Sequence, residues 1–81
     1  MRTAIKQTGN TFNLNGAIVA VRTLDEARAM WIDLRDSEGL GASDMVRGCG
    51  DYFEAGIKVA KVSYNGRMWT PEPWPACKEI R

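Results

Sequence analysis

The chain has 81 residues, of which 44% are hydrophobic and 26% are charged, and its formal net charge is +1. This composition is that of one globular domain over residues 1–81, and so small a charge predicts no strong general attraction to nucleic acid or membranes. No apolar run approaches the roughly 20 residues of a membrane span, and the first residues lack the apolar segment of a signal peptide. We therefore expect a cytoplasmic protein with no membrane contact.

Charge is unevenly distributed along the chain. Residues 1–24 carry a net charge of +3, residues 25–54 a net charge of −5, and residues 55–81 a net charge of +3. The acidic section contains the only segment with a clear helical pattern, whereas the basic sections are strand-like. An acidic helix opposite basic strands is therefore expected.

The side chains that most often build catalytic and metal sites are scarce. Histidine is absent, and Cys49 and Cys77 lie far apart. Two thiols alone cannot form the usual Cys/His zinc site, and the usual base for nucleophilic catalysis is missing. We expect a non-enzymatic protein without metal or cofactor, in which two free thiols are favoured over a disulfide.

The N-terminal part of the sequence predicts strands. Residues 2–7 alternate weakly between apolar and polar side chains, which indicates a short first strand. Asn15-Gly16 then separates two strand-like runs, and a two-residue type I′ turn there pairs Leu14 with Ala17 and Phe12 with Val19. Phe12 and Val19 therefore share a core face with Leu14 and Val21, and Ile18 falls on the other face.

A helix follows directly. Thr23 and Glu26 form a capping box, in which the Thr23 hydroxyl accepts from the Glu26 N–H and the Glu26 carboxylate accepts from the Thr23 N–H. Trp31 lies in an apolar stripe at helical spacing, and Ile32 falls on the opposite side. Gly39 and Gly41 are natural stops, so the helix is expected to end near Ser37 or Glu38.

The segment from Gly39 to Gly56 holds five glycines in eighteen residues. Two interpretations stay open for it: a single helical turn beginning at Ser43-Asp44, or a short strand over residues 44–48, which we favour. The glycines follow a helix C-terminus, whereas a phosphate-binding loop precedes a helix N-terminus. They are therefore interpreted as cap and turn residues.

The second half of the chain predicts another hairpin. The alternation slips between Val59 and Ala60, which indicates a β-bulge or burial of both faces. A two-residue turn at Asn65-Gly66 then pairs Tyr64 with Arg67 and Val62 with Trp69, which assigns Trp69 to the core.

The C-terminal tail, residues 71–81, is rich in proline. Proline at positions 71, 73 and 75 disfavours regular sheet pairing and favours extended polyproline II conformation, so the last strand ends near Thr70. Trp74 either packs across the domain or offers an aromatic anchor to a partner. The whole chain is therefore expected to be α+β: a small antiparallel sheet with two Asn-Gly hairpins against one amphipathic helix, in the order β(β)β-α-(β)ββ.

One resemblance can be drawn from an ordered set of short motifs. The set comprises Leu-Arg-Asp at 34–36, Gly-Leu-Gly-Ala-Ser at 39–43, and Val-Ser-Tyr-Asn-Gly-Arg-Met-Trp at 62–69 followed by proline. In these motifs the C-terminal half resembles small uncharacterised proteins of tailed bacteriophages and prophages. The resemblance implies no activity and no site.

The functional hypothesis is a small phage or prophage accessory protein that acts by binding another protein or its own copy. The alternative is a nucleic-acid-binding module that uses basic and aromatic side chains at the rim of the sheet. The candidate binding residues are Lys58, Lys61, Tyr64, Arg67 and Trp74.

Overall fold

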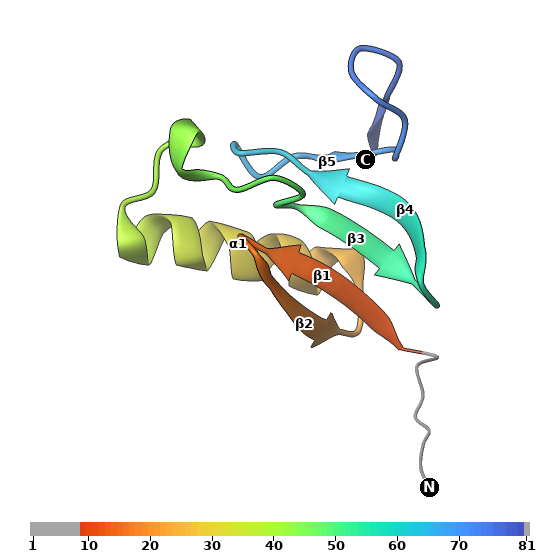
Figure 1. The fold of residues 1–81 in the computed structure, drawn as a ribbon, viewed down its shortest axis with the longest axis horizontal. Coiled ribbons are helices and arrows are strands. Elements are labelled where there is room, and N and C mark those ends of the chain that lie inside the picture. The colour runs from red at the N-terminus through yellow and green to blue at the C-terminus, as the bar shows by residue number, and fades with distance from the viewer. Residues whose placement is uncertain (1–8, 81) are drawn as a thin grey trace, which may run out of the picture.

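The protein is an antiparallel sheet with one helix packed against one face (Figure 1). A computed structural model describes residues 9–80. The sheet runs in the order β2-β1-β3-β4-β5-β6. The elements are β1 (Asn10–Leu14), β2 (Ala17–Val21), α1 (Leu24–Glu38), the 3₁₀ turn η1 (Ala42–Asp44), β3 (Asp51–Glu54), β4 (Ile57–Val62), β5 (Met68–Trp69) and β6 (Glu79–Ile80).

This arrangement confirms the α+β class. Four strands follow α1, namely β3 to β6, where the expected order β(β)β-α-(β)ββ allowed at most three. The predicted strand over residues 2–7 lies outside the described residues. No helix of residues 9–80 is long and apolar enough to cross a membrane.

The β1–β2 hairpin has the predicted register. Phe12 pairs with Val19 and Leu14 with Ala17. Asn15 and Gly16 have φ values of 49° and 102°, as a type I′ turn requires at both central positions. The hairpin was predictable because its turn type matches the twist of the strands it joins.

Helix α1 begins and ends as its sequence indicates. The Thr23 hydroxyl accepts from the Glu26 N–H at 3.1 Å, and Gly39 ends the helix in the left-handed conformation with φ 64°. One part of the capping box was wrong: the Glu26 carboxylate accepts from the N–H of Arg22, at 2.6 Å, rather than from that of Thr23. The carboxylate therefore secures the chain one residue earlier.

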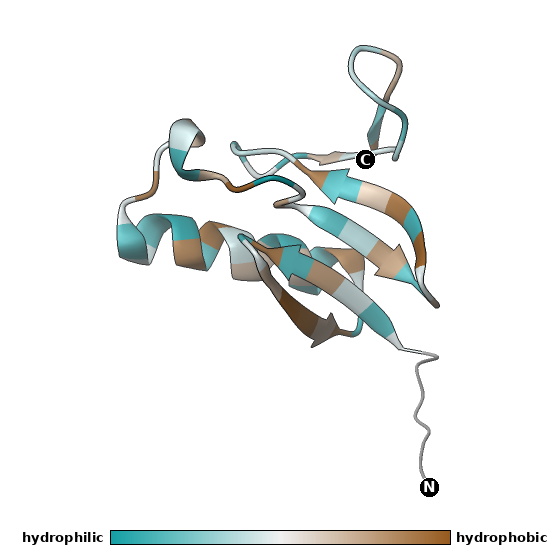
Figure 2. Cartoon of the chain, viewed as in Figure 1, coloured by the Kyte–Doolittle hydropathy of each residue, from teal (hydrophilic) through white to brown (hydrophobic). Residues whose placement is uncertain are grey.

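The core lies between α1 and the sheet. Trp31 of the helix and Phe12 of β1 are 0% exposed, and Tyr52 of β3 is fully buried beside them. Ala60 and Val62 of β4 complete the same cluster. In Figure 2 the apolar positions of the central strands alternate with polar ones, as expected for a sheet with one covered face.

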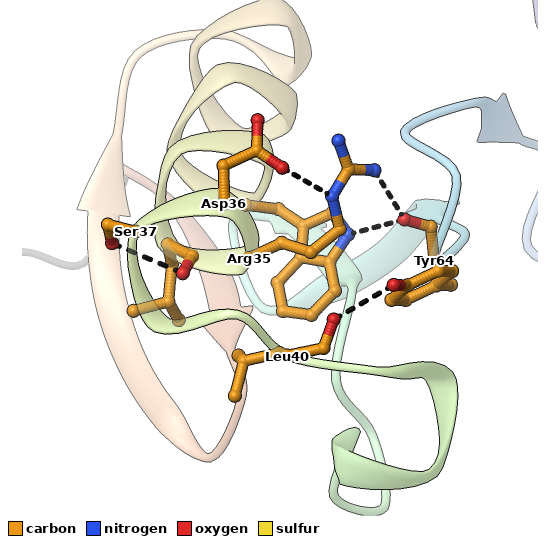
Figure 3. A network of polar contacts seen from close by, with 7 residues as sticks. Arg35, Asp36, Ser37, Leu40 and Tyr64 are labelled. Atoms are coloured by element: carbon orange, nitrogen blue, oxygen red, sulfur yellow. Dashed lines mark hydrogen bonds and ion pairs between the residues drawn. The ribbon is translucent and has the colours of Figure 1, made fainter.

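Side chains of α1 hold the β4–β5 turn through backbone carbonyls. The Tyr64 carbonyl accepts from Trp31 Nε1 at 3.1 Å and from Arg35 Nη1 at 2.9 Å, and the Tyr64 hydroxyl donates to the Leu40 carbonyl at 2.8 Å (Figure 3). Ile32 was expected on the solvent side of the helix, but it is half-buried because it packs beside Gly66.

The segment between α1 and β3 corrects the favoured interpretation. Residues 44–48 form no strand; η1 supplies the single helical turn, and β3 begins only at Asp51. Gly50 explains the late start: its N–H donates to the Asn13 carbonyl at 2.9 Å and its carbonyl accepts from the Val62 N–H at 2.8 Å. With φ 92° it enters the sheet in a conformation that other residues rarely adopt.

Strand β4 contains the predicted bulge. Tyr52 pairs with Ala60 and Phe53 with Lys58, so Val59 is the extra residue. The slip in the apolar alternation therefore marks the position where the strand changes face.

The second hairpin has a register different from the one predicted. Val62 pairs with Met68, and Lys61 pairs with Trp69. The Gly66 N–H bonds to the Ser63 carbonyl and the Ser63 N–H bonds to the Arg67 carbonyl, each at 2.9 Å, so the loop is three residues long and ends in a left-handed glycine. A shift of one residue reverses the face of every following side chain. Met68 therefore faces the core, and the assignment of Trp69 to the core was wrong.

The C-terminal tail returns to the sheet and adds a strand to it. After the proline-rich loop the chain returns, and β6 pairs with β5 through Met68–Ile80 and Trp69–Glu79. The sheet thus extends beyond Thr70, where it was expected to stop.

We predict that Gly50→Ala destabilises the protein by about 3 kcal/mol or more, because a Cβ there would overlap the backbone of Val62 and meet an unfavourable φ. Gly56→Ala is the matched control: φ is 83°, but nothing lies within 4 Å of the added carbon, so about 1 kcal/mol is expected. Urea denaturation measures both. Equal losses would contradict the close approach of Gly50 to β4.

We predict that Trp31→Ala costs about 3 to 5 kcal/mol, because it empties the centre of the core, and that it unfolds most of the population. Trp74→Ala, at an exposed tryptophan, serves as the control and should leave the fold intact. Thermal denaturation followed by circular dichroism compares the two. An unchanged melting temperature for Trp31→Ala would show that the helix is wrongly placed.

Candidate functional site

The face of the sheet opposite α1 carries a row of charged and aromatic side chains. Pairing places Lys61 opposite both Asp51 and Trp69, and Lys58 opposite Phe53. Their neighbours in the strands, Tyr52, Ala60 and Val62, belong to the core. No helix of residues 9–80 covers this second face, which we call the uncovered face.

Trp74 lies at one side of the uncovered face and is 58% exposed. Its ring meets that of Trp69 edge to face, with 4.9 Å between centroids and an interplanar angle of 67°. The ammonium of Lys61 lies 4.2 Å from the centroid of the Trp74 ring, within range of a cation–π interaction. Trp74 therefore both packs on the domain and offers its ring to solvent, and we call Lys61, Trp69 and Trp74 the aromatic platform.

The loop that carries Trp74 is closed at its base by hydrogen bonds. The Thr70 N–H donates to the Lys78 carbonyl and the Lys78 N–H donates to the Thr70 hydroxyl, both at 2.8 Å. Within the loop the Ala76 N–H donates to the Pro73 carbonyl, also at 2.8 Å, and Cys77 is buried. In Figure 1 this loop, in dark blue, projects beyond the sheet.

Lys61 links the loop to the sheet. Its side chain is buried, with the residue 9% exposed, and its Nζ donates to the Glu72 carbonyl at 2.8 Å. A buried ammonium requires such partners, and here a carbonyl and an aromatic ring supply them. A hydrogen bond from Thr70, then a backbone N–H and the charges of Lys61 and Lys78, lower the pKa of Glu72, which stays ionised beside the platform.

A groove of about 570 Å³ runs between the segment 45–51 and β4 and reaches Trp74. Lys58 Nζ forms an ion pair with Asp51 at 3.1 Å inside it, and Arg47 is exposed at its border. Cys49 also lines the groove, but burial is the main cause that raises the pKa of its thiol, so the reactive thiolate is disfavoured. The lining is Met45, Arg47, Gly48, Cys49, Asp51, Lys58, Lys61, Val62, Ser63, Tyr64 and Trp74.

Four of the five candidate binding residues line this groove: Lys58, Lys61, Tyr64 and Trp74. Tyr64 contributes mainly to the fold, because its hydroxyl is bound to Leu40 and its ring meets Trp31 at 6.3 Å. Arg67 lies elsewhere.

Arg67 borders a second hollow of about 400 Å³, near Arg28 and Met68, and its Nε lies 4.0 Å from a Glu79 carboxylate oxygen. Arg67 therefore does not line the groove that the other four candidates share.

Sequence reasoning missed two members of the site. Arg47 was assigned to a strand. The neighbouring Gly48 indicated the alternative, that Arg47 lies in a loop. Trp69 was assigned to the core because a two-residue turn was assumed; a three-residue loop ending in Gly66 was the alternative that places it on the uncovered face.

The described residues, 9–80, contain no group of three or more cysteine, aspartate or glutamate side chains able to hold a metal ion. Comparisons with protein-family models, with curated proteins and with solved structures find no match to this chain. The resemblance to bacteriophage proteins stays a prediction.

We predict that Lys61→Met loosens the aromatic platform. The variant loses both the hydrogen bond to Glu72 and the cation–π contact, so we expect a stability loss of about 1 to 2 kcal/mol and a lower NMR order parameter for the Trp74 indole N–H. Lys58→Met is the control, because its ion pair with Asp51 does not involve the loop. An unchanged order parameter in Lys61→Met would show that Lys61 does not hold Trp74.

Proposed function

We propose that this protein is a non-enzymatic binding module, of the accessory kind that bacteriophages and prophages encode, and that it binds a segment of another protein. The observation that carries the proposal is Trp74: a large aromatic ring that is 58% exposed and yet contacts both Trp69 and Lys61. Exposed tryptophans that are already ordered are typical anchors of protein interfaces, because little entropy is lost on binding.

The groove beside Trp74 indicates the chemistry of the partner. Among the described residues, three cationic side chains line the groove, those of Arg47, Lys58 and Lys61, and one carboxylate, that of Asp51. Asp51 is paired with Lys58. Arg47 remains exposed at the border. A partner segment with an aromatic or aliphatic side chain for Trp74 and a carboxylate for Arg47 fits both features.

Single-stranded nucleic acid is the second candidate. A base stacked on Trp74 with phosphates beside Arg47 and Lys58 would use the same surface. The ionised Glu72 next to the platform and the ion pair of Lys58 reduce the positive potential of this surface. For this reason we place the protein partner first.

Selection of displayed random peptides on the immobilised chain tests the proposal. We expect the enriched peptides to combine an aromatic or aliphatic residue with an acidic one. Trp74→Ala should weaken the binding of the synthesised peptides by about 30-fold or more, the effect of a hot-spot residue. Ile57→Ala is the control, because Ile57 is similarly exposed but lies at the β3–β4 turn.

Peptides that bind wild type and Trp74→Ala equally, or that share no such pattern, would contradict the proposal. Fluorescent single-stranded DNA and RNA are titrated in parallel at low and high salt. Salt-dependent binding that Trp74→Ala weakens, in the absence of peptide binding, would support the nucleic-acid candidate instead.

A further inference from the structure

We propose that two copies of this chain associate by antiparallel pairing of their β2 strands. β2 is the outermost strand of the sheet among the described residues, and its sequence, Ala-Ile-Val-Ala-Val, has no charge and no proline. In Figures 1 and 2 it lies at the margin of the sheet and is hydrophobic along its length. Proteins usually protect such an edge with charges, proline, bulges or short length.

The other edge of the sheet is protected in this way. β6 has only two residues, and one of them is Glu79. β2 therefore differs from β6 in length, charge and hydropathy. A strand edge with these properties is a template for pairing with another strand.

The register of the β1–β2 hairpin shows which backbone groups of β2 face outward. Leu14 and Ala17 flank the two-residue turn. In a hairpin of this type the flanking pair is hydrogen-bonded, and bonded pairs alternate with non-bonded pairs along an antiparallel ladder. Ala17, Val19 and Val21 thus bond to β1. The N–H and C=O groups of Ile18 and Ala20 point away from β1, to the side of β2 where no other strand of residues 9–80 lies.

The groups at both ends of this edge already have partners. The Gly16 N–H donates to the Asn13 side chain at 2.6 Å, and the Arg22 N–H donates to the Glu26 carboxylate at 2.6 Å. The Arg22 carbonyl accepts from the Asn10 side chain at 3.0 Å. Within the described part of the chain, the backbone groups of β2 that are available for pairing are therefore those of Ile18 and Ala20.

A two-fold axis at Val19 relates the two copies, so that Ile18 and Ala20 of one copy can pair with Ala20 and Ile18 of the other. Antiparallel pairing then sets Ile18 of each copy opposite Ala20 of the other and forms four backbone hydrogen bonds. Ile18, which is 63% exposed, gains a small apolar neighbour, and no like charges meet within the strands. The axis is perpendicular to the sheet, so both uncovered faces lie on the same side of the pair.

Sedimentation equilibrium of the full chain tests the association. We expect the apparent mass to rise from 9.0 kDa toward twice that value, with a dissociation constant on the order of 100 µM for so small an interface. Ile18→Lys should weaken association at least about tenfold. Ile57→Lys is the matched control, because Ile57 is 67% exposed and the chemical change is the same. A monomer at all concentrations, or equal effects of the two substitutions, would overturn the proposal.

Cross-linking tests the register. In Val19→Cys the two introduced thiols face each other directly, so mild oxidation should give a disulfide between them, located by peptide mapping. In Ile18→Cys the thiols are offset by two residues, and we expect at least about tenfold less symmetric disulfide. Equal yields from both variants would overturn a pairing centred on Val19.

Discussion

The carbonyl of Tyr64 is the point at which helix and sheet are joined. The indole of Trp31 is fully buried, and its N–H requires an acceptor that the apolar core does not offer. The Tyr64 carbonyl, at 3.1 Å, supplies it and also accepts from Arg35. The loop that presents this carbonyl to the helix is three residues long. That loop turns Met68 inward and Trp69 outward, and the aromatic platform is a consequence of this register.

Local chemistry predicted those parts of the fold whose determinants lie close together in sequence. The first Asn-Gly hairpin, the helix with its end at Glu38, and the bulge at Val59 all follow from turn type, capping and alternation. The second Asn-Gly turn was compatible with a loop of either two or three residues. The three-residue loop is the one in which the Tyr64 carbonyl accepts from Trp31, a residue 33 positions earlier in the sequence. A contact between residues so far apart cannot be predicted from a local sequence pattern.

The sequence predicted most of the residues of the candidate site, but it did not predict how the C-terminal loop arranges them. The candidates were chosen as basic and aromatic residues in the second half of the chain, and four of them line one groove. The alternating prolines, however, indicated an extended tail. The hydrogen bonds between Thr70 and Lys78 instead fold it back, so that Trp74 meets Trp69 and Lys61. Pairing between residues eight positions apart is not specified by proline spacing, and the platform could not be predicted for that reason.

The hydrogen bonds between Thr70 and Lys78 at the base of the loop affect how the protein can evolve. They separate the six residues 71–76 from the core, because the ladder continues into β6 on the far side of the loop. Substitutions within this segment alter the surface that we propose binds a partner, and they leave the buried cluster between α1 and the sheet unchanged, because that cluster contains no residue of 71–76. If the proposed binding role holds, this scaffold can change its partner by replacement of the loop alone, both in natural divergence and in laboratory grafting.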